Sequence, residues 1–203
     1  MSIEVKISKR RISYKRAMKI LNKRVEQQKA GRGKELLWIL EHPTTYTAGI
    51  RSNNKEILDK TIRVVKTNRG GKITLHSPGQ KIIYFVLNLN NRKRDIRKLI
   101  NAIEKSIIEF LSIYKIKGIK DTKNIGIWVK ERKIAAIGFR ISRWIAFHGC
   151  SINIDNNLNL YKKIVPCGLD NNKITSVYKE NKIKITNFEK KISNIFIKNI
   201  NSI

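Results

Sequence analysis

The chain has 203 residues, 41% of them hydrophobic, which suits a single domain with an ordinary core over residues 1–203. No stretch approaches the roughly 18 consecutive apolar residues of a membrane helix, and the first residues lack the apolar centre of a secretion signal, so we expect a cytoplasmic protein that does not associate with membranes. The net charge of +29 favours an acidic partner, but a chain-wide drift toward Lys, Ile and Asn explains it equally well.

In the first half of the chain, apolar spacing predicts one helix followed by strands. Tyr14, Ala17, Leu21 and Val25 recur at helical spacing, and Ser13 precedes them as an N-cap. Short apolar runs bounded by polar residues then predict strands. The predicted strands cover residues 36–41, 62–66 and 81–89.

The second half of the chain contains the strongest helical pattern, which follows Asp95 as its N-cap. The apolar face of this helix consists of Ile96, Leu99, Ile100, Ile103, Ile107, Phe110, Leu111 and Tyr114. The elements predicted after it are a hairpin over 125–141 with its turn at 130–133, a strand over 144–154 and a closing helix over 188–196. Strands and hairpins joined to a few helices indicate an α+β or mixed α/β domain.

Three segments break the local rules of strand and helix, and the first is the loop over residues 68–80. Gly70 and Gly71 let the backbone approach a ligand closely, because no side chain intervenes. Polar side chains stand on both sides of this pair, namely Arg69, His76 and Gln80. The pattern fits a ligand-binding loop, and it fits a plain hairpin turn equally well.

The second segment covers residues 133–138 and consists largely of small residues. Ala135, Ala136 and Gly138 leave room for a ligand against the predicted strand. Lys133 stands where the predicted turn enters that strand. A lysine in so lysine-rich a chain is far more often part of the solvated surface than a catalyst, so the position alone indicates no function.

The third segment is the Pro166-Cys167-Gly168 turn, which would present the sulfur rather than pack it. A thiol becomes a nucleophile when a nearby cation or base favours its thiolate. His148 is a candidate base, although a histidine satisfied within the core fits the same pattern. The other cysteine, Cys150, is too far along the chain for a C-x-x-C pair, and by default either cysteine is a buried small hydrophobe.

Together these segments resemble the lipoyl(octanoyl) transferase family. The resemblance rests on motif blocks that occur in order, at family-like spacing, between about Leu36 and Ser176. The blocks are Arg69-Gly70-Gly71 with His76-Ser77-Pro78-Gly79-Gln80, Lys133-Ile134-Ala135-Ala136-Ile137-Gly138, His148-Gly149-Cys150-Ser151-Ile152-Asn153, Pro166-Cys167-Gly168, and Thr175-Ser176. Three departures from the family pattern, Leu75, Ser77 and Ser151, lie beside the expected acyl pocket and leave the cysteine and the lysine in place.

The resemblance implies the fold of biotin and lipoate protein ligases, a mixed sheet flanked by helices. It implies transfer of an octanoyl group from octanoyl-acyl carrier protein to a lysine of lipoyl domains. The implied acceptors are the lipoyl domains of 2-oxoacid dehydrogenases and the H protein of the glycine cleavage system. No metal, nucleotide or organic cofactor and no nucleic acid is implied, and we expect a monomer.

Carried over residue by residue, the family roles make Cys167 the nucleophile that forms an octanoyl thioester. Lys133 becomes the cation that favours the thiolate and then accepts the proton of the attacking lysine. Backbone N–H groups at Cys167 and Gly168 would hold the oxyanion. The residues implied to line the acyl chain and its carbonyl are Arg69, Gly70, Gly71, Lys72, Ile73, Thr74, Leu75, His76, Ala136, Ile137, Gly138, Gly149, Cys150 and Ser151.

Three other functions fit parts of the sequence. An ATP-dependent lipoate ligase on the same fold would activate a free acid and would not need Cys167. A basic nucleic-acid-binding protein would show aromatic residues interleaved with Lys or Arg, but only 7% of the residues are aromatic and bulk charge alone supports it. An inactive paralogue acting as a scaffold would not need to keep both Lys133 and Cys167.

Overall fold

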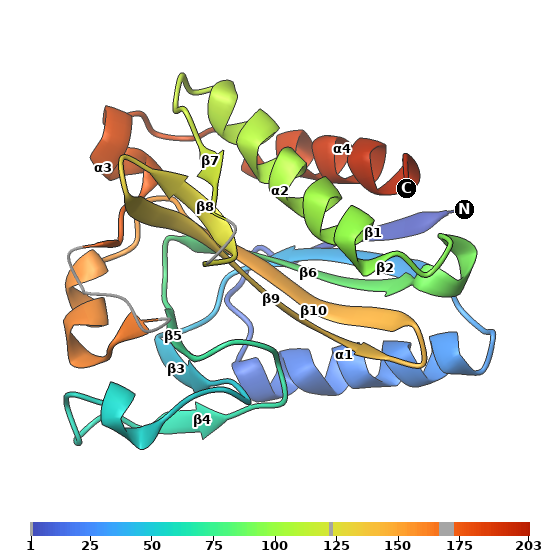
Figure 1. Ribbon diagram of the computed structural model, residues 1–203, viewed down its shortest axis with the longest axis horizontal. Helices are drawn as coiled ribbons and strands as arrows, with labels where there is room; N and C mark the ends of the chain where they lie inside the picture. The colour runs from blue at the N-terminus through green and yellow to red at the C-terminus, as the bar shows by residue number, and fades with distance from the viewer. Residues whose placement is uncertain (1, 122–123, 167–172) are drawn as a thin grey trace.

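The computed structural model describes residues 2–121, 124–166 and 173–203, which form a large sheet covered by helices with a small sheet beside it (Figure 1). The elements in chain order are β1 (Ile3–Ile7), α1 (Tyr14–Lys29), β2 (Glu35–Leu40), β3 (Thr45–Ala48), η1 (Asn54–Glu56), β4 (Val64–Lys66), β5 (Ile73–His76), β6 (Gln80–Asn88), η2 (Leu89–Asn91), α2 (Ile96–Ser112), β7 (Ile119–Lys120), β8 (Gly126–Val129), β9 (Arg132–Ser142), β10 (Ile145–Asn153), η3 (Leu158–Lys163), α3 (Val177–Asn181) and α4 (Phe188–Asn201). The seven-stranded sheet has the order β1-β2-β6-β10-β9-β8-β7, and the three-stranded sheet has the order β4-β3-β5. Because β1 runs parallel to β2 while β6 is antiparallel to both β2 and β10, the large sheet is mixed, as predicted.

Different helices cover the two faces of the large sheet: α1 lies on one face, and α2 and α4 lie on the other (Figure 1). Successive side chains of a strand point to opposite faces. In β2, Leu36 and Trp38 therefore pack with α1, whereas Leu37 and Ile39 pack with α2 and α4. Each such side chain contributes about 1.5–3 kcal/mol when fully buried, which explains why the central strands are continuous apolar runs. The predicted mixed sheet flanked by helices is confirmed.

The helix boundaries follow the predicted caps. The Ser13 hydroxyl accepts a hydrogen bond from the Arg16 N–H at 3.4 Å, and the Asp95 carboxylate accepts one from the Lys98 N–H at 2.9 Å. Ile96, predicted on the apolar face of α2, is exposed: it is the first residue of the helix, and the buried face begins at Leu99. Among the described residues, no helix is both long and apolar enough to cross a membrane.

The hairpin of β8 and β9 has a tighter turn than predicted. Val129 pairs with Arg132, so the turn is only Lys130 and Glu131, with φ of 47° and 62°. Two left-handed residues form the type of turn whose twist matches that of the flanking strands. Lys133 therefore belongs to β9 and is paired with Trp128, and the predicted four-residue turn is wrong.

Several short elements were not predicted from the sequence. The strand expected over 62–66 is only Val64–Lys66, and β5 lies inside the segment expected to be a loop. A plain hairpin turn over residues 68–80 is wrong, because the two predicted strands that flank it, β4 and β6, belong to different sheets. The connection from β4 to β5 passes β3, which lies between them in the small sheet, and its residues line a cavity.

Candidate active site

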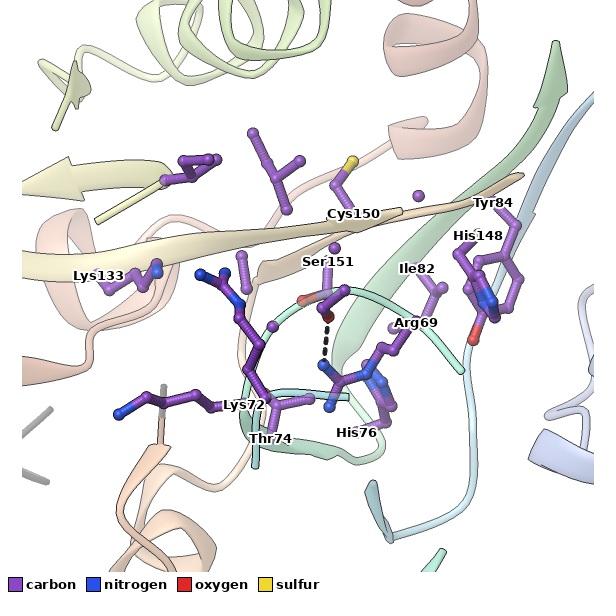
Figure 2. A pocket seen from close by; sticks show the side chains of 18 of the residues that line it. Arg69, Lys72, Thr74, His76, Ile82, Tyr84, Lys133, His148, Cys150 and Ser151 are labelled. Carbon is purple, nitrogen blue, oxygen red and sulfur yellow. Dashed lines mark hydrogen bonds between the residues drawn. The ribbon is translucent and has the colours of Figure 1, made fainter. Parts of the chain in front are cut away.

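A cavity of about 270 Å³ opens between the large sheet and the small sheet. It brings together residues from the glycine loop after β4, from β5, from β9 and from β10 (Figure 2). The lining residues are Tyr14, Arg51, Arg69, Gly70, Gly71, Lys72, Thr74, His76, Ile82, Tyr84, Asn124, Ile125, Lys133, Ala136, Ile137, Gly138, His148, Gly149, Cys150 and Ser151. Three motif blocks that lie far apart in the sequence thus meet around one cavity.

Side chains along β5 alternate between the two faces of the small sheet, and this alternation decides which of them reach the cavity. Thr74 and His76 line it, whereas Ile73 and Leu75 point to the other face. Ile73 and Leu75 are fully buried there, in a cluster that includes Tyr161. The two residues were predicted to line the acyl chain, but they form the core of the small sheet instead.

Arg69 turns back to hold the glycine loop. Its guanidinium donates hydrogen bonds to the Thr47 carbonyl at 2.7 Å and to the Gly70 carbonyl at 2.9 Å. The loop packs so closely that a Cβ on Gly49 would lie 2.3 Å from the Gly71 carbonyl oxygen. Gly71 itself has a φ of 89°, a conformation that side chains rarely adopt. Arg69 is therefore a buried support of the cavity wall.

Small residues of β9 and β10 form the opposite wall. Ser151 pairs with Ala136, and Gly149 pairs with Gly138. A Cβ on Gly138 would approach the Gly70 carbonyl oxygen to 3.2 Å, so the glycine lets the loop come close to the sheet. The resulting wall presents backbone and small side chains, which suits a slender ligand.

Lys133 is buried at the edge of this cavity, with 5% of its surface exposed. The interpretation as a solvated surface lysine is wrong. Its ammonium lies 5.3 Å from the centre of the Trp128 ring. Gly126 has a φ of 143°, and a Cβ there would lie 2.4 Å from the Lys133 Cε, so this glycine makes the space that the lysine occupies.

Cys167 and Gly168 lie outside the described residues, as does the oxyanion turn predicted for them. Their described neighbours along the chain lie beside Lys133. Pro166 and Ile174 line a small pocket together with Lys133. The Thr175 N–H also donates a hydrogen bond to the Lys133 carbonyl at 3.0 Å.

Cys150 reaches the cavity but belongs to the core. It is buried in the same cluster as Ala146 and Ile152, and burial raises the pKa of its thiol well above the usual range. A thiol that is hard to ionise is a poor nucleophile. The default interpretation as a small buried hydrophobe therefore describes Cys150.

The three histidines of the chain, His42, His76 and His148, lie around the cavity or directly behind it. Burial lowers the pKa of His42 to about 4, that of His76 to about 3 and that of His148 to about 4. All three are therefore neutral at pH 7. Each then has one N–H and one bare nitrogen, and its neighbours decide which is which.

Carbonyl acceptors orient the first two rings. The His42 Nδ1–H donates to the Ile12 carbonyl at 2.5 Å, so the Tyr84 hydroxyl donates to His42 Nε2 at 2.8 Å. The Gln80 amide donates its N–H groups to neighbouring oxygens, so its own oxygen accepts from His76 Nδ1–H at 2.8 Å. His42, His76 and Tyr84 are thus neutral groups of fixed orientation at or behind the cavity wall, whereas the cationic residues of the lining are Arg51, Arg69, Lys72 and Lys133.

Sequence reasoning missed Tyr14, His42 and Tyr84, which occupy ordinary helix, loop and strand positions in the sequence. No spacing or motif singles them out. The described residues contain no group of three or more His, Cys, Asp or Glu side chains placed to hold a metal ion. A cavity with a buried lysine at its edge, small side chains along one wall and neutral histidines around it or behind it can hold an apolar chain and stabilise an anion at its reactive end.

The chain is similar to known proteins over most of its length. Residues 13–197 match the model of the lipoyl protein ligase A/B catalytic domain. The octanoyltransferase of Ehrlichia chaffeensis is 44% identical over 183 residues, covering 87% of this chain and 86% of that protein. The octanoyltransferase of Wolbachia sp. subsp. Brugia malayi is 40% identical over 201 residues, covering 97% of both.

A solved structure shows the same fold at low identity. Lipoate-protein ligase A bound with ATP superimposes with a TM-score of 0.72 at 14% identity, over 98% of this chain and 85% of that one. This likeness confirms the expected lipoate ligase-like fold. Because the family model matches most of the chain and curated relatives exceed 40% identity, the chain belongs to the octanoyltransferase family of the lipoyl protein ligase A/B catalytic domain.

Proposed function

We propose that this acyltransferase moves an octanoyl group from the thioester of an acyl carrier protein to a lysine of a lipoyl domain, through a thioester on Cys167. One observation carries the proposal: Lys133 is buried between the cavity and the residues that flank Cys167 along the chain. A desolvated cation at that place favours a thiolate. The cavity beyond it would receive the acyl chain.

Two acyl transfers complete the proposed reaction. The Cys167 thiolate attacks the carrier-bound carbonyl, a new C–S bond forms, the bond to the carrier sulfur breaks, and the carrier thiolate leaves and takes a proton from the Lys133 ammonium. The amine of the acceptor lysine then attacks the Cys167 thioester, a C–N bond forms, and the Cys167 thiolate leaves. An amine must be neutral to attack, so Lys133 in its neutral form accepts the proton that the acceptor loses.

This chemistry distinguishes the proposal from an ATP-dependent ligase on the same fold. A thioester is already activated, so we expect acylation of a lipoyl domain from octanoyl-acyl carrier protein without nucleotide. Intact-protein mass spectrometry of the acceptor measures the product. The matched control supplies free octanoate with ATP and Mg²⁺. Transfer from the free acid alone, and none from the thioester, would identify a ligase.

The net charge of +29 fits acidic protein substrates. If it steers them, kcat/KM for the two protein substrates is expected to fall about tenfold as ionic strength rises from low values past about 0.1 M, where the Debye length is about 10 Å. A small uncharged octanoyl thioester with a small amine acceptor serves as the control and should respond little. Equal salt dependence for both substrate pairs would mean that the charge is compositional drift.

A further inference from the structure

His148 stands at the end of the cavity that is opposite Lys133. Figure 2 shows Lys133 on one side and Tyr84 with His148 on the other, with Thr74 and Ser151 between them. Under the proposed function, the acyl carbonyl lies near Lys133. The tail of the chain then points toward His148 and Tyr84.

The backbone at His148 turns the ring toward this cavity. In a regular strand, the side chains of neighbouring residues point to opposite faces. His148 has a φ of 74°, in the left-handed region, and its ring stacks on that of Phe147 at a centroid distance of 4.9 Å. The two neighbours therefore share one face. A residue other than glycine in this conformation is strained, and such strain occurs mainly where the surrounding structure enforces it.

Pairing on both sides enforces the conformation. His148 is paired with Phe85 of β6 and with Phe139 of β9, so the strand cannot relax there. On the cavity side, the His148 Nε2–H donates to the Asn68 side-chain oxygen at 3.0 Å. Asn68 is itself exposed, so the His148 ring contacts both the cavity and a surface residue at the start of the glycine loop.

We propose that His148 closes the far end of the cavity and thereby sets the length of the acyl chain that the enzyme transfers. This inference rests on the proposed function, because it assumes an acyl chain whose carbonyl is held at the Lys133 end. Tyr84 stands at the same end, but the hydrogen bond to His42 holds it in place. His148 is the group whose removal would open the cavity toward Asn68.

The left-handed backbone supplies a clean test. Glycine adopts a φ of 74° without strain, so His148→Gly removes the ring and keeps the local backbone. The measurement is the ratio of kcat/KM for decanoyl to that for octanoyl, with both chains on the same small thiol. Each buried methylene is worth about fourfold, so we expect the ratio to rise about fifteenfold in His148→Gly.

Two further variants test whether a change in the ratio comes from the size of the side chain at residue 148. His148→Asn also tolerates the left-handed conformation, has a shorter side chain, and should raise the ratio by a smaller factor. Asn187→Gly replaces another left-handed residue, with φ of 53°, at the N-cap of α4 away from the cavity, and should leave the ratio unchanged.

Two outcomes would overturn the length proposal while octanoyl transfer persists. One is an unchanged ratio in a folded His148→Gly or His148→Asn protein. The other is a wild-type enzyme that transfers dodecanoyl as fast as octanoyl, which requires no variant to fold. Absence of transfer with every chain in the wild-type enzyme would contradict the proposed function instead.

Discussion

Cys167→Ala is expected to lose octanoyl transfer by at least about a thousandfold and to form no acyl adduct, because the proposed reaction has no other nucleophile. Cys150→Ala is expected to keep the adduct and most of the transfer activity. The thiol of Cys150 is buried in the core, and its raised pKa keeps it protonated at pH 7. The two variants remove the same atom from the two cysteines of the chain.

Intact-protein mass spectrometry after mixing with octanoyl-acyl carrier protein reads the adduct directly. Peptide mapping then locates it, and hydroxylamine should release it, since thioesters are cleaved under mild conditions whereas amides are not. An adduct on Cys150 with Cys167 unmodified would overturn the assignment of the nucleophile.

Lys133→Met is expected to reduce transfer by about a hundredfold or more, since the variant loses both the cation beside the thiolate and the acceptor of the lysine proton. Methionine keeps the apolar stem out to Cε, which fills the space beside Gly126 and Trp128, so the fold should persist. Lys130→Met is the matched control. It removes an exposed lysine from the turn of the same hairpin and should leave transfer near the wild-type rate.

Alkylation of Cys167 by iodoacetamide across a range of pH separates the two roles of Lys133. If the cation favours the thiolate, the reaction in Lys133→Met should require a higher pH than in the wild-type protein and in Lys130→Met. A profile that matches the wild type, together with slow transfer to the acceptor, would restrict Lys133 to the deprotonation step. Full transfer activity in Lys133→Met would exclude both roles.

The sequence by itself determined the long helices and strands, and it identified candidate residues for the site. The helical spacing from Tyr14 to Val25 and from Leu99 to Phe110, with caps at Ser13 and Asp95, predicted α1 and α2 because periodicity and capping are local properties. The long strands followed from continuous apolar runs. The motif blocks placed Lys133 and the glycine loop among the candidate site residues, and both border the cavity.

Only the tertiary structure decided which of the candidate side chains face the cavity and which are buried elsewhere. Short strands such as β3 and β5 have too few residues for a periodic signal, and their pairing depends on segments far along the chain. Register then decided that Thr74 faces the cavity while Leu75 faces the core, because a shift of one residue reverses the faces of a strand. The burial of Lys133 needed the two-residue turn and the space beside Gly126. The inward turn of His148 needed a left-handed φ, which is uncommon in any residue other than glycine and which the pairing of β10 with both neighbours enforces.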